Sequence, residues 1–364
     1  MNKSVYYIVG VMSGTSLDGI DMAYIRFEYD GVKWNFKILN AQTVAYSKEW
    51  KRLLQGAINL NRKELEAFDE RYTTYLAHII SNFIAEYKLI EIDAICSHGH
   101  TIFHKPELGY TLQIGNLGIL ADLLQQRVVC DFRVQDVLLG GQGAPLVPIG
   151  DRLLFSTYDA CLNLGGFANV SFENKLGYRI AYDICPVNVL LNAEAYRLGK
   201  EYDDKGKWAA EGKICDDLLN ELNSLSYYGM LPPKSLGIEF VQSFVHPLVM
   251  KYNLSPKDAL ATYVEHIAMQ IGQGIPLQES SRILVTGGGA FNDYLLSRIQ
   301  FYGNNKYFET TERLIVEFKE ALIFGFLGVL KLRDEVNVLA SVTGAKYDHS
   351  SGRIFNCYQD DSPV

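Results

Sequence analysis

The sequence lacks any hydrophobic run near the roughly 20 apolar residues that a membrane-spanning helix needs. Its first apolar stretch, residues 5–12, is too short for a secretory signal and lacks a small-residue cleavage site. The six cysteines are scattered and form no CxxC pair, which is typical of reduced thiols rather than of a disulfide framework. We therefore expect a cytoplasmic protein with no membrane partner.

Positive charge is also scarce, because 34 Lys and Arg residues stand against 42 Asp and Glu residues, a formal net charge of −8. This balance argues against a nucleic-acid partner. The phosphate-binding pattern GxxxxGK[ST] is absent. The remaining composition, 48% hydrophobic and 21% charged, is that of an ordinary globular protein. At 364 residues, a prior of roughly 150 residues per domain predicts two domains.

Strand and helix patterns alternate along the chain, which predicts an α/β protein. Strands are expected at 4–12, 20–27 and 36–46. A long helix should follow, because apolar residues between Leu65 and Tyr87 recur at helical spacing. The densest Gly/Pro punctuation, "LLGGQGAPLVP", marks a domain junction. The stretch "DACLNLGGFANVSF" then repeats the N-terminal order of strand, glycine turn and strand, which hints at a duplication.

The stretch "VMSGTSLDGID", residues 11–21, combines small hydroxyl residues, two glycines and two aspartates between two apolar runs. A hairpin with such a turn offers backbone N–H groups and hydroxyls to a phosphate without side-chain obstruction. The aspartates are suited to hold Mg²⁺ through water. Taken alone, a purely structural polar turn explains the motif slightly better.

Two further segments predict strand-to-helix turns with polar chemistry. In "IAYDICPVNVLLNAEAYRLG", Asp183 ends a strand before a helix from about Asn188. This is a usual place for a catalytic base, although a helix-capping role has even odds on spacing alone. In "RILVTGGGAFNDYLLSRI", three glycines precede a helix from about Asn292. They suit the approach of a nucleotide, but tight turns also use glycine for purely structural reasons.

Two other patterns favour ordinary explanations. His98, His100 and His104 lack the spacing and the neighbouring thiolates or carboxylates of a zinc site, so a metal-free loop is favoured. Cys185 has no histidine partner in sequence and is expected to be a packed small residue rather than a nucleophile.

Together these segments resemble one family, the anhydro-N-acetylmuramic acid kinases of the hexokinase–actin superfamily. The resemblance covers nearly the whole chain in the family's order. The matching stretches are "GVMSGTSLDGID", "SHGHTIFHKP", "QIGN", "DFRVQDVLLGGQGAPLVP", "LNLGGFANVSF", "PPKSLGIEF", "VTGGGAFNDYL", "EALIFGFL" and "NVLASVTGA".

The resemblance implies two actin-like (ribonuclease H-like) α/β domains around a central cleft, with ATP and Mg²⁺ as cofactors and a homodimer as the assembly. It implies that water opens the bridge of 1,6-anhydro-N-acetylmuramic acid and that O6 takes the γ-phosphoryl group of ATP. The product is N-acetylmuramic acid 6-phosphate, in cell-wall sugar recycling. We place the domains at 1–130, with the tail from about 350 returning to it, and at 131–349.

The resemblance also assigns roles to residues of this chain. Asp183 is the expected catalytic base, and Asp18 and Asp21 are expected to hold Mg²⁺ through water. The residues expected to bind ATP and its phosphates are Gly14, Thr15, Ser16, Leu17, Asp18, Gly19, Ile20, Asp21, Gly165, Gly166, Gly287, Gly288 and Gly289. Those expected to contact the sugar are His98, Gly99, His100, Thr101, Arg133 and Glu320.

Three departures from the family pattern keep an alternative open, an actin-like nucleotide-binding protein or sensor with reduced or altered sugar kinase activity. The family's Asp-Thr-Gly-Pro-Gly-Asn reads "DICPVN" here, so Cys185 and Val187 are expected to narrow the site or shift the loop. His100 replaces a glutamine, and Asp151 replaces the histidine of a His-Arg pair.

Overall fold

The computed structural model describes residues 3–357, and the chain forms two compact units. Unit 1 comprises Met1–Leu154 and Phe318–Val364, and unit 2 is the continuous segment Phe155–Glu317. These boundaries differ from the expected 130 and 350. The chain leaves unit 1 only after helix α5 (Val147–Leu154). It returns within helix α13 (Arg313–Leu332), whose second half packs on the sheet of unit 1.

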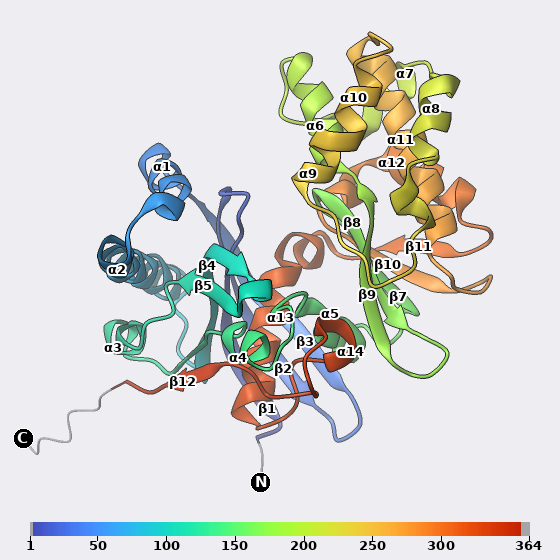
Figure 1. Cartoon of the computed structure of the whole chain (residues 1–364). Coiled ribbons are helices and arrows are strands. Elements are labelled where there is room, and N and C mark those ends of the chain that lie inside the picture. Colours follow the sequence, from blue (N-terminus) through green and yellow to red (C-terminus); the bar gives the residue numbers. More distant parts are fainter. Residues whose placement is uncertain (1–2, 358–364) are drawn as a thin grey trace, which may run out of the picture. The chain divides into compact units, whose positions relative to one another are not determined.

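Unit 1 is built on a mixed sheet with the strand order β12-β6-β4-β1-β2-β3, and β5 pairs with β4 (Figure 1). Strands β1, β2 and β3 form an antiparallel meander, whereas β4 and β6 run parallel to β1. The strands are β1 (Val5–Ser13), β2 (Gly19–Tyr29), β3 (Trp34–Ala45), β4 (Ala94–Lys105), β5 (Tyr110–Ile114), β6 (Val128–Cys130) and β12 (Arg353–Phe355). The other helices are α1 (Lys48–Gly56), α2 (Arg62–Glu86), α3 (Ile119–Leu124), α4 (Val134–Leu138) and α14 (Ala340–Thr343).

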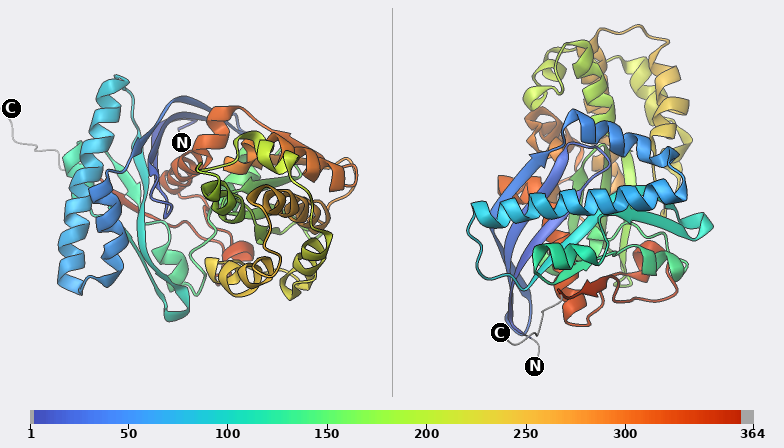
Figure 2. Two further views of the ribbon diagram at one scale, coloured as in Figure 1. Left: turned by 90° about the horizontal axis from the view of Figure 1, so that it is seen from above. Right: turned by 90° about the vertical axis from the view of Figure 1, so that its left-hand side faces the viewer.

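Alternation along β1 places helices on both faces of this sheet. Val9 and Val11 pack in the core shared with α2, which lies along one face in Figure 2. On the other face a Cβ on Gly10 would fall on the carbonyl of Ala321 in α13, so the strand and the helix touch through backbone. Helix α2 is the predicted long helix. Asn61 and Glu64 form a capping box at its start.

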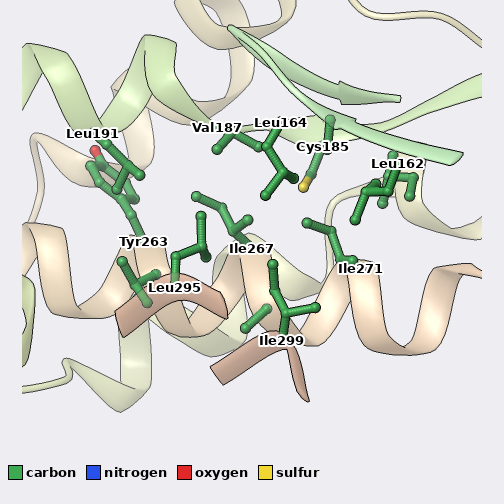
Figure 3. Close-up of a cluster of buried hydrophobic side chains, with 14 of the residues drawn as sticks. Leu162, Leu164, Cys185, Val187, Leu191, Tyr263, Ile267, Ile271, Leu295 and Ile299 are labelled. Atoms are coloured by element: carbon green, nitrogen blue, oxygen red, sulfur yellow. The ribbon is translucent and has the colours of Figure 1, made fainter. Parts of the chain in front are cut away.

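Unit 2 contains a second sheet with the strand order β11-β10-β7-β8-β9. Its strands are β7 (Ala160–Leu164), β8 (Phe167–Glu173), β9 (Arg179–Pro186), β10 (Arg282–Thr286) and β11 (Tyr307–Thr310). Its helices are α6 (Asn188–Arg197), α7 (Lys207–Glu211), α8 (Asp216–Asn223), α9 (Ile238–Phe240), α10 (His246–Val249), α11 (Pro256–Gly274) and α12 (Asp293–Tyr302). Figure 3 shows the main core, where Leu162 and Leu164 meet Ile267 and Ile271 of α11.

Five strands of the first sheet have the same topology as the second sheet. In each, an antiparallel meander of three strands is extended by two strands that run parallel to its first strand. This is the order of the ribonuclease H-like fold, so the expected actin-like α/β class is confirmed. The repeat seen in the sequence therefore extends to five strands of each sheet, while β5 and β12 of unit 1 have no counterpart in unit 2. Within residues 3–357, no helix combines the length and the apolar character needed to cross a membrane.

Candidate functional site

The motif expected to bind phosphate is a hairpin turn in unit 1, as the sequence predicted. Residues 14–18 connect β1 to β2, and Leu17 N–H donates to the Gly14 carbonyl at 3.2 Å. Thr15, Ser16 and Asp18 are exposed at this turn, so their polar groups are open to a ligand. The other expected contacts are less accessible, because Leu17 and Gly19 are buried and Ile20 lies in the core.

The two aspartates of the motif occupy different environments. Asp18 is exposed at the turn, whereas Asp21 is half-buried and accepts a hydrogen bond from the Thr43 hydroxyl at 2.6 Å. Surrounding protein raises the pKa of Glu320, and the charge of Asp21 raises it further. A divalent cation would relieve the repulsion between the carboxylates of Asp21 and Glu320. The carboxylates of Asp18 and Asp21 therefore fit Mg²⁺. Within the described part of the chain, no three His, Cys, Asp or Glu residues form a complete metal-binding group.

Residues 98–101, which were expected to form a sugar-binding loop, do not form a loop. The expected loop was wrong, and the sugar contact stays a prediction. The segment lies inside β4, because β5 pairs with the second half of the strand and extends the sheet. His98 and His100 are each only 3% exposed, Gly99 is buried with a φ of 74°, and Thr101 is half-buried. Both ring nitrogens of His98 are engaged: Nδ1 donates to the Gly99 carbonyl at 2.9 Å, and Nε2 accepts from Arg133 at 2.7 Å.

Arg133 joins this strand to the loop before α5. Its Nε donates to His98, and its Nη1 donates to the Gly143 carbonyl at 2.7 Å. Burial lowers the pKa of Arg133 to about 10, while the nearby Glu320 opposes that shift. The guanidinium therefore remains charged at neutral pH and stands in a fixed orientation. A positive group held in this way is suited to bind an oxygen of a ligand.

Asp151, which departs from the family pattern, has a charged partner nearby. Its carboxylate forms an ion pair with Lys319 at 2.7 Å, and both side chains are almost fully buried. Lys319 precedes Glu320 on α13, and its charge lowers the pKa of Glu320. Asp151 therefore compensates a buried lysine beside the expected sugar contact, which makes the departure a matter of charge balance.

His100, the second departure, takes part in a buried polar chain. Its Nδ1 lies 2.8 Å from the Ser13 hydroxyl, and Ser13 lies 2.7 Å from the hydroxyl of Tyr46. Burial lowers the pKa of His100 to about 4, so the ring is neutral at pH 7. The ring also lines a cavity of about 200 Å³ together with Thr15 and Thr101.

Asp183 in unit 2 has the geometry of a proton acceptor. It lies within β9, and its Oδ2 accepts a hydrogen bond from Leu236 N–H at 2.8 Å. Its Oδ1 has no hydrogen bond with the described residues and is not sealed from solvent. Burial raises the pKa of Asp183, and the Leu236 N–H opposes this shift. The carboxylate does not cap α6, so the helix-capping interpretation is wrong.

The two glycine turns of unit 2 lie together at the ends of β7 and β10. A Cβ on Gly287 would come within 2.8 Å of the Leu164 backbone, and one on Gly289 within 2.7 Å of the Leu164 side chain. These glycines therefore have a packing role, whereas Gly288 is exposed. Nearby, the Asn188 side chain donates to the Leu164 carbonyl at 3.0 Å.

The glycine turn of residues 165–166 connects directly to the start of α6. The backbone N–H of Val187 donates to the Gly166 carbonyl at 2.8 Å, and that of Asn188 to the Gly165 carbonyl at 3.3 Å. Gly165 is half-buried and Gly166 is exposed. The five expected nucleotide-binding glycines of unit 2 thus lie in one cluster, whereas Gly14 and Gly19 belong to unit 1.

The residues that replace the family's glycines in "DICPVN" do not obstruct this cluster. Cys185 and Val187 are fully buried and point into the core of unit 2, as Figure 3 shows. Their side chains fill space on the core side, so they do not narrow the site, and the expected shift of the loop stays a prediction. Cys185 is a packed thiol, and burial raises its pKa.

Sequence reasoning missed several polar residues near these sites. Tyr72 was expected only as an apolar position of the long helix, yet its hydroxyl lies 2.6 Å from that of Tyr46. Lys234 lies on the segment beside Asp183, with its ammonium 4.6 Å from the centre of the Tyr227 ring. Asp136 is fully buried and accepts hydrogen bonds from Gly143 and Thr343. The detectable signal was a carboxylate inside the apolar run "VQDVLL".

The model of the anhydro-N-acetylmuramic acid kinase family matches residues 6–357 of the chain. The anhydro-N-acetylmuramic acid kinase of Pseudomonas syringae pv. syringae is 33% identical over 96% of this chain and 99% of its own length. The enzyme of the same name from Sulfurimonas denitrificans is 34% identical over 96% and 99%. A solved ROK family glucokinase of Streptomyces griseus, in complex with glucose and AMPPNP, covers 88% of this chain and 98% of its own. The two chains are 11% identical, with a TM-score of 0.39.

Proposed function

The chain belongs to the anhydro-N-acetylmuramic acid kinase family, and from this membership we propose that it phosphorylates 1,6-anhydro-N-acetylmuramic acid with ATP. The reaction opens the 1,6-anhydro bridge and yields N-acetylmuramic acid 6-phosphate and ADP. The observation that carries the proposal is Asp183, which has one carboxylate oxygen held by backbone and the other open.

An anhydrosugar has no free O6 hydroxyl, so the base must act on water. Water attacks C1 as the C1–O6 bond breaks, and the electron pair of that bond passes to O6. Asp183 accepts the proton that the water loses, which requires an ionised carboxylate. O6 then attacks the γ-phosphorus of ATP, and the β–γ bridging oxygen leaves with ADP. One carboxylate and one water thereby replace the base that an ordinary sugar kinase uses on a hydroxyl.

The other expected residues bind and orient the two substrates. Thr15, Ser16 and the backbone of the turn at 14–18 donate hydrogen bonds to ATP phosphates. Asp18 and Asp21 would hold Mg²⁺ through water, and bound Mg²⁺ supplies charge neutralisation for the transferring phosphoryl group. The exposed Gly288 and Gly166 allow close approach of the nucleotide.

Sugar binding falls to the polar groups of unit 1. The Arg133 guanidinium, fixed by His98 and by the Gly143 carbonyl, donates to a sugar oxygen. Glu320 accepts from a sugar hydroxyl, while Gly99 and Thr101 shape the strand at this point. Two of the three departures behind the sensor alternative have a structural explanation. Cys185 and Val187, which replace glycines, point into the core, and Asp151 forms an ion pair with Lys319.

Turnover in ¹⁸O-labelled water tests the proposed reaction directly. We expect the label at C1 of the phosphorylated sugar and no label in the transferred phosphoryl group. N-acetylmuramic acid 6-phosphate incubated in the same water without enzyme controls for exchange at C1. Label in free phosphate, without a sugar product, would identify plain ATP hydrolysis and would refute the proposal.

We also propose that the protein acts in the cytoplasm and assembles as a homodimer, as the family resemblance implies. None of its six cysteines forms a disulfide in the described part of the chain, which fits a reducing compartment. Sedimentation equilibrium at micromolar protein concentration tests the assembly. A mass near twice 41.0 kDa supports a dimer, and a mass of 41.0 kDa contradicts it.

A further inference from the structure

Asp183 lies at the edge of the sheet of unit 2, where a loop segment takes the place of a further strand. Strand β9 is the last in the strand order and pairs with β8 on one side. On its other side, the Asp183 N–H donates to the Lys234 carbonyl at 3.2 Å, and the Leu236 N–H donates to Oδ2 of Asp183 at 2.8 Å. The Asp183 carbonyl accepts from the Tyr227 hydroxyl at 2.7 Å. Three polar groups of Asp183 are thus held from outside the sheet.

These contacts follow the pattern of a parallel strand pair with one hydrogen bond diverted. In such a pair, the N–H of one residue donates to the partner strand, and its carbonyl accepts from the partner residue two positions later. Asp183 meets Lys234 and Leu236 in this order, but its carboxylate accepts from Leu236 in place of its carbonyl. The carbonyl is already bound by the Tyr227 hydroxyl. The hydroxyl therefore leaves the Leu236 N–H available to the carboxylate.

The Tyr227 ring also anchors the loop segment on both sides of Leu236. The Lys234 ammonium lies 4.6 Å from the centre of the ring and donates to the Tyr227 carbonyl at 3.2 Å. The centre of the Phe240 ring lies 5.3 Å from that of Tyr227. Tyr227 itself is only 7% exposed. One buried side chain thus holds both the Asp183 carbonyl and the segment that carries the donor to its carboxylate.

The charges around Asp183 make the Leu236 contact important for its ionisation. Burial raises the pKa of Asp183, and the hydrogen bond from Leu236 opposes this shift. The titratable side chains within two residues of Asp183 or on the segment 227–236 are Tyr182, Cys185, Tyr227, Tyr228 and Lys234. The tyrosines and the cysteine are neutral at pH 7, because burial raises the pKa of each.

The remaining neighbours do not replace the Leu236 contact. The Lys234 ammonium lies over the Tyr227 ring. On α11, which packs against β9, burial lowers the pKa of His266 to about 3, so this ring is neutral at pH 7. Among the described residues, the Leu236 N–H is the one hydrogen-bond donor to the Asp183 carboxylate.

We propose that Tyr227 is a positioning residue for Asp183: its hydroxyl occupies the Asp183 carbonyl, so that the Leu236 N–H holds Oδ2 and leaves Oδ1 for the reacting water. The inference rests on the proposed function, in which Asp183 is the base. Without the hydroxyl, the Leu236 N–H would bind the Asp183 carbonyl, as in a regular parallel pair. The carboxylate would then lose the hydrogen bond that orients it.

Amide NMR of the wild-type, full-length protein tests the contact of Leu236 with the carboxylate without any assay of activity. The shift of an amide proton that binds a carboxylate changes when the carboxylate is protonated. We expect the Leu236 amide proton to titrate with the same midpoint as the carboxyl ¹³C signal of Asp183. That carboxyl signal is identified by its absence from Asp183→Asn. A Leu236 amide that does not follow the Asp183 titration would overturn the inference.

Two neighbouring tyrosines supply a matched pair of variants. Tyr227→Phe removes the hydroxyl that binds the Asp183 carbonyl, and Tyr228→Phe removes a hydroxyl that lies 2.9 Å from Nε2 of His266. Each variant loses one tyrosine hydrogen bond, so we expect similar losses of stability. Only Tyr227→Phe should raise the midpoint of the Asp183 titration, by about one pH unit, because the N–H that stabilises the ionised carboxylate is diverted. An unchanged midpoint in Tyr227→Phe, or an equal rise in Tyr228→Phe, would refute the role of Tyr227.

The pH profile of kcat/KM, which reports the free enzyme, connects this contact to the reaction. The acidic limb of Tyr227→Phe should move to higher pH by the same amount as the Asp183 titration, while Tyr228→Phe keeps the wild-type limb. If the titration moves and the limb does not, Tyr227 does not act on the base, and the inference fails. If the wild type does not phosphorylate the anhydrosugar, the proposed function fails, while the NMR titrations still decide whether Tyr227 directs the Leu236 N–H to Asp183.

Discussion

At the scale of single residues, the two sites share one principle of construction. Asp183 and His100 each have one polar atom held by the protein and the other left open. The held atom fixes the orientation of each side chain. The open atom is the one available for chemistry or recognition. Such pairs of held and open atoms distinguish functional polar groups from polar groups that only satisfy the fold.

Replacing Asp183 by Asn should leave substrate binding intact and lower kcat by at least about 10²-fold, because the amide cannot accept the proton of the water. The pKa of Asp183 is raised by burial, and the base works only when ionised. The wild-type rate should therefore fall as pH decreases through a value above the usual aspartate range. Steady-state kinetics across pH measure both effects. A normal rate, or an unchanged acidic limb in the variant, would show that Asp183 is not the base.

At the scale of elements, buried hydrogen bonds and close contacts between backbone atoms hold the candidate functional segments in place. Asp136 on α4 accepts from Gly143 N–H at 2.6 Å and from the Thr343 hydroxyl at 2.7 Å. Gly143 in turn presents its carbonyl to Arg133. The loop that orients the arginine is therefore tied to the segment at α14, far along the chain.

Asp136→Ala should destabilise the protein by about 2–4 kcal/mol, because the Gly143 N–H and the Thr343 hydroxyl would lose their buried acceptor. Urea denaturation measures this loss. Asp136→Asn retains one acceptor oxygen and should cost less. A variant with alanine that is as stable as the wild type would mean that water replaces the carboxylate at this position.

Gly10→Ala tests the contact between β1 and α13. The added Cβ would overlap the Ala321 carbonyl, so the helix must move, at a cost of about 1–3 kcal/mol in the free energy of unfolding. Gly56→Ala is the matched control, because nothing lies within 4 Å of a Cβ built there. The control should be as stable as the wild type or slightly more stable, since alanine favours helix. Equal destabilisation of both variants would contradict the packing argument.

At the scale of the whole molecule, the chain uses one topology twice but divides its sequence unequally. Unit 2 is continuous, whereas unit 1 is closed only when residues from Phe318 onward return. Each unit has its own sheet and its own buried core. The same strand order in both halves is the product expected of a duplication.

Because unit 2 is continuous and has its own core, a fragment of residues 155–317 should fold alone. We expect a cooperative thermal transition by circular dichroism and dispersed amide signals by NMR. A fragment of residues 1–154 should lack both, since the α13 layer that covers one face of its sheet would be missing. A non-cooperative transition of the 155–317 fragment would show that its core depends on unit 1.

The sequence by itself determined the elements and the order of the motifs. Helical spacing predicted α2, and the hairpin at residues 14–18 and the strand carrying Asp183 followed from local patterns. Such features depend on neighbours in the chain, where backbone preference and periodicity act. The expectation of a loop around His98 was wrong. The second half of β4 pairs with β5, and the polar residues of this segment hide the strand pattern in the sequence.

Only the tertiary structure decided which distant side chains meet. The pairs Asp136–Thr343 and Ser13–His100 are 207 and 87 residues apart in sequence. It also decided that Cys185 and Val187 face the core. These two side chains therefore do not narrow the site, although they replace glycines of the family pattern. Local pattern cannot determine these outcomes, because the register and the packing of the sheets set the direction of each side chain.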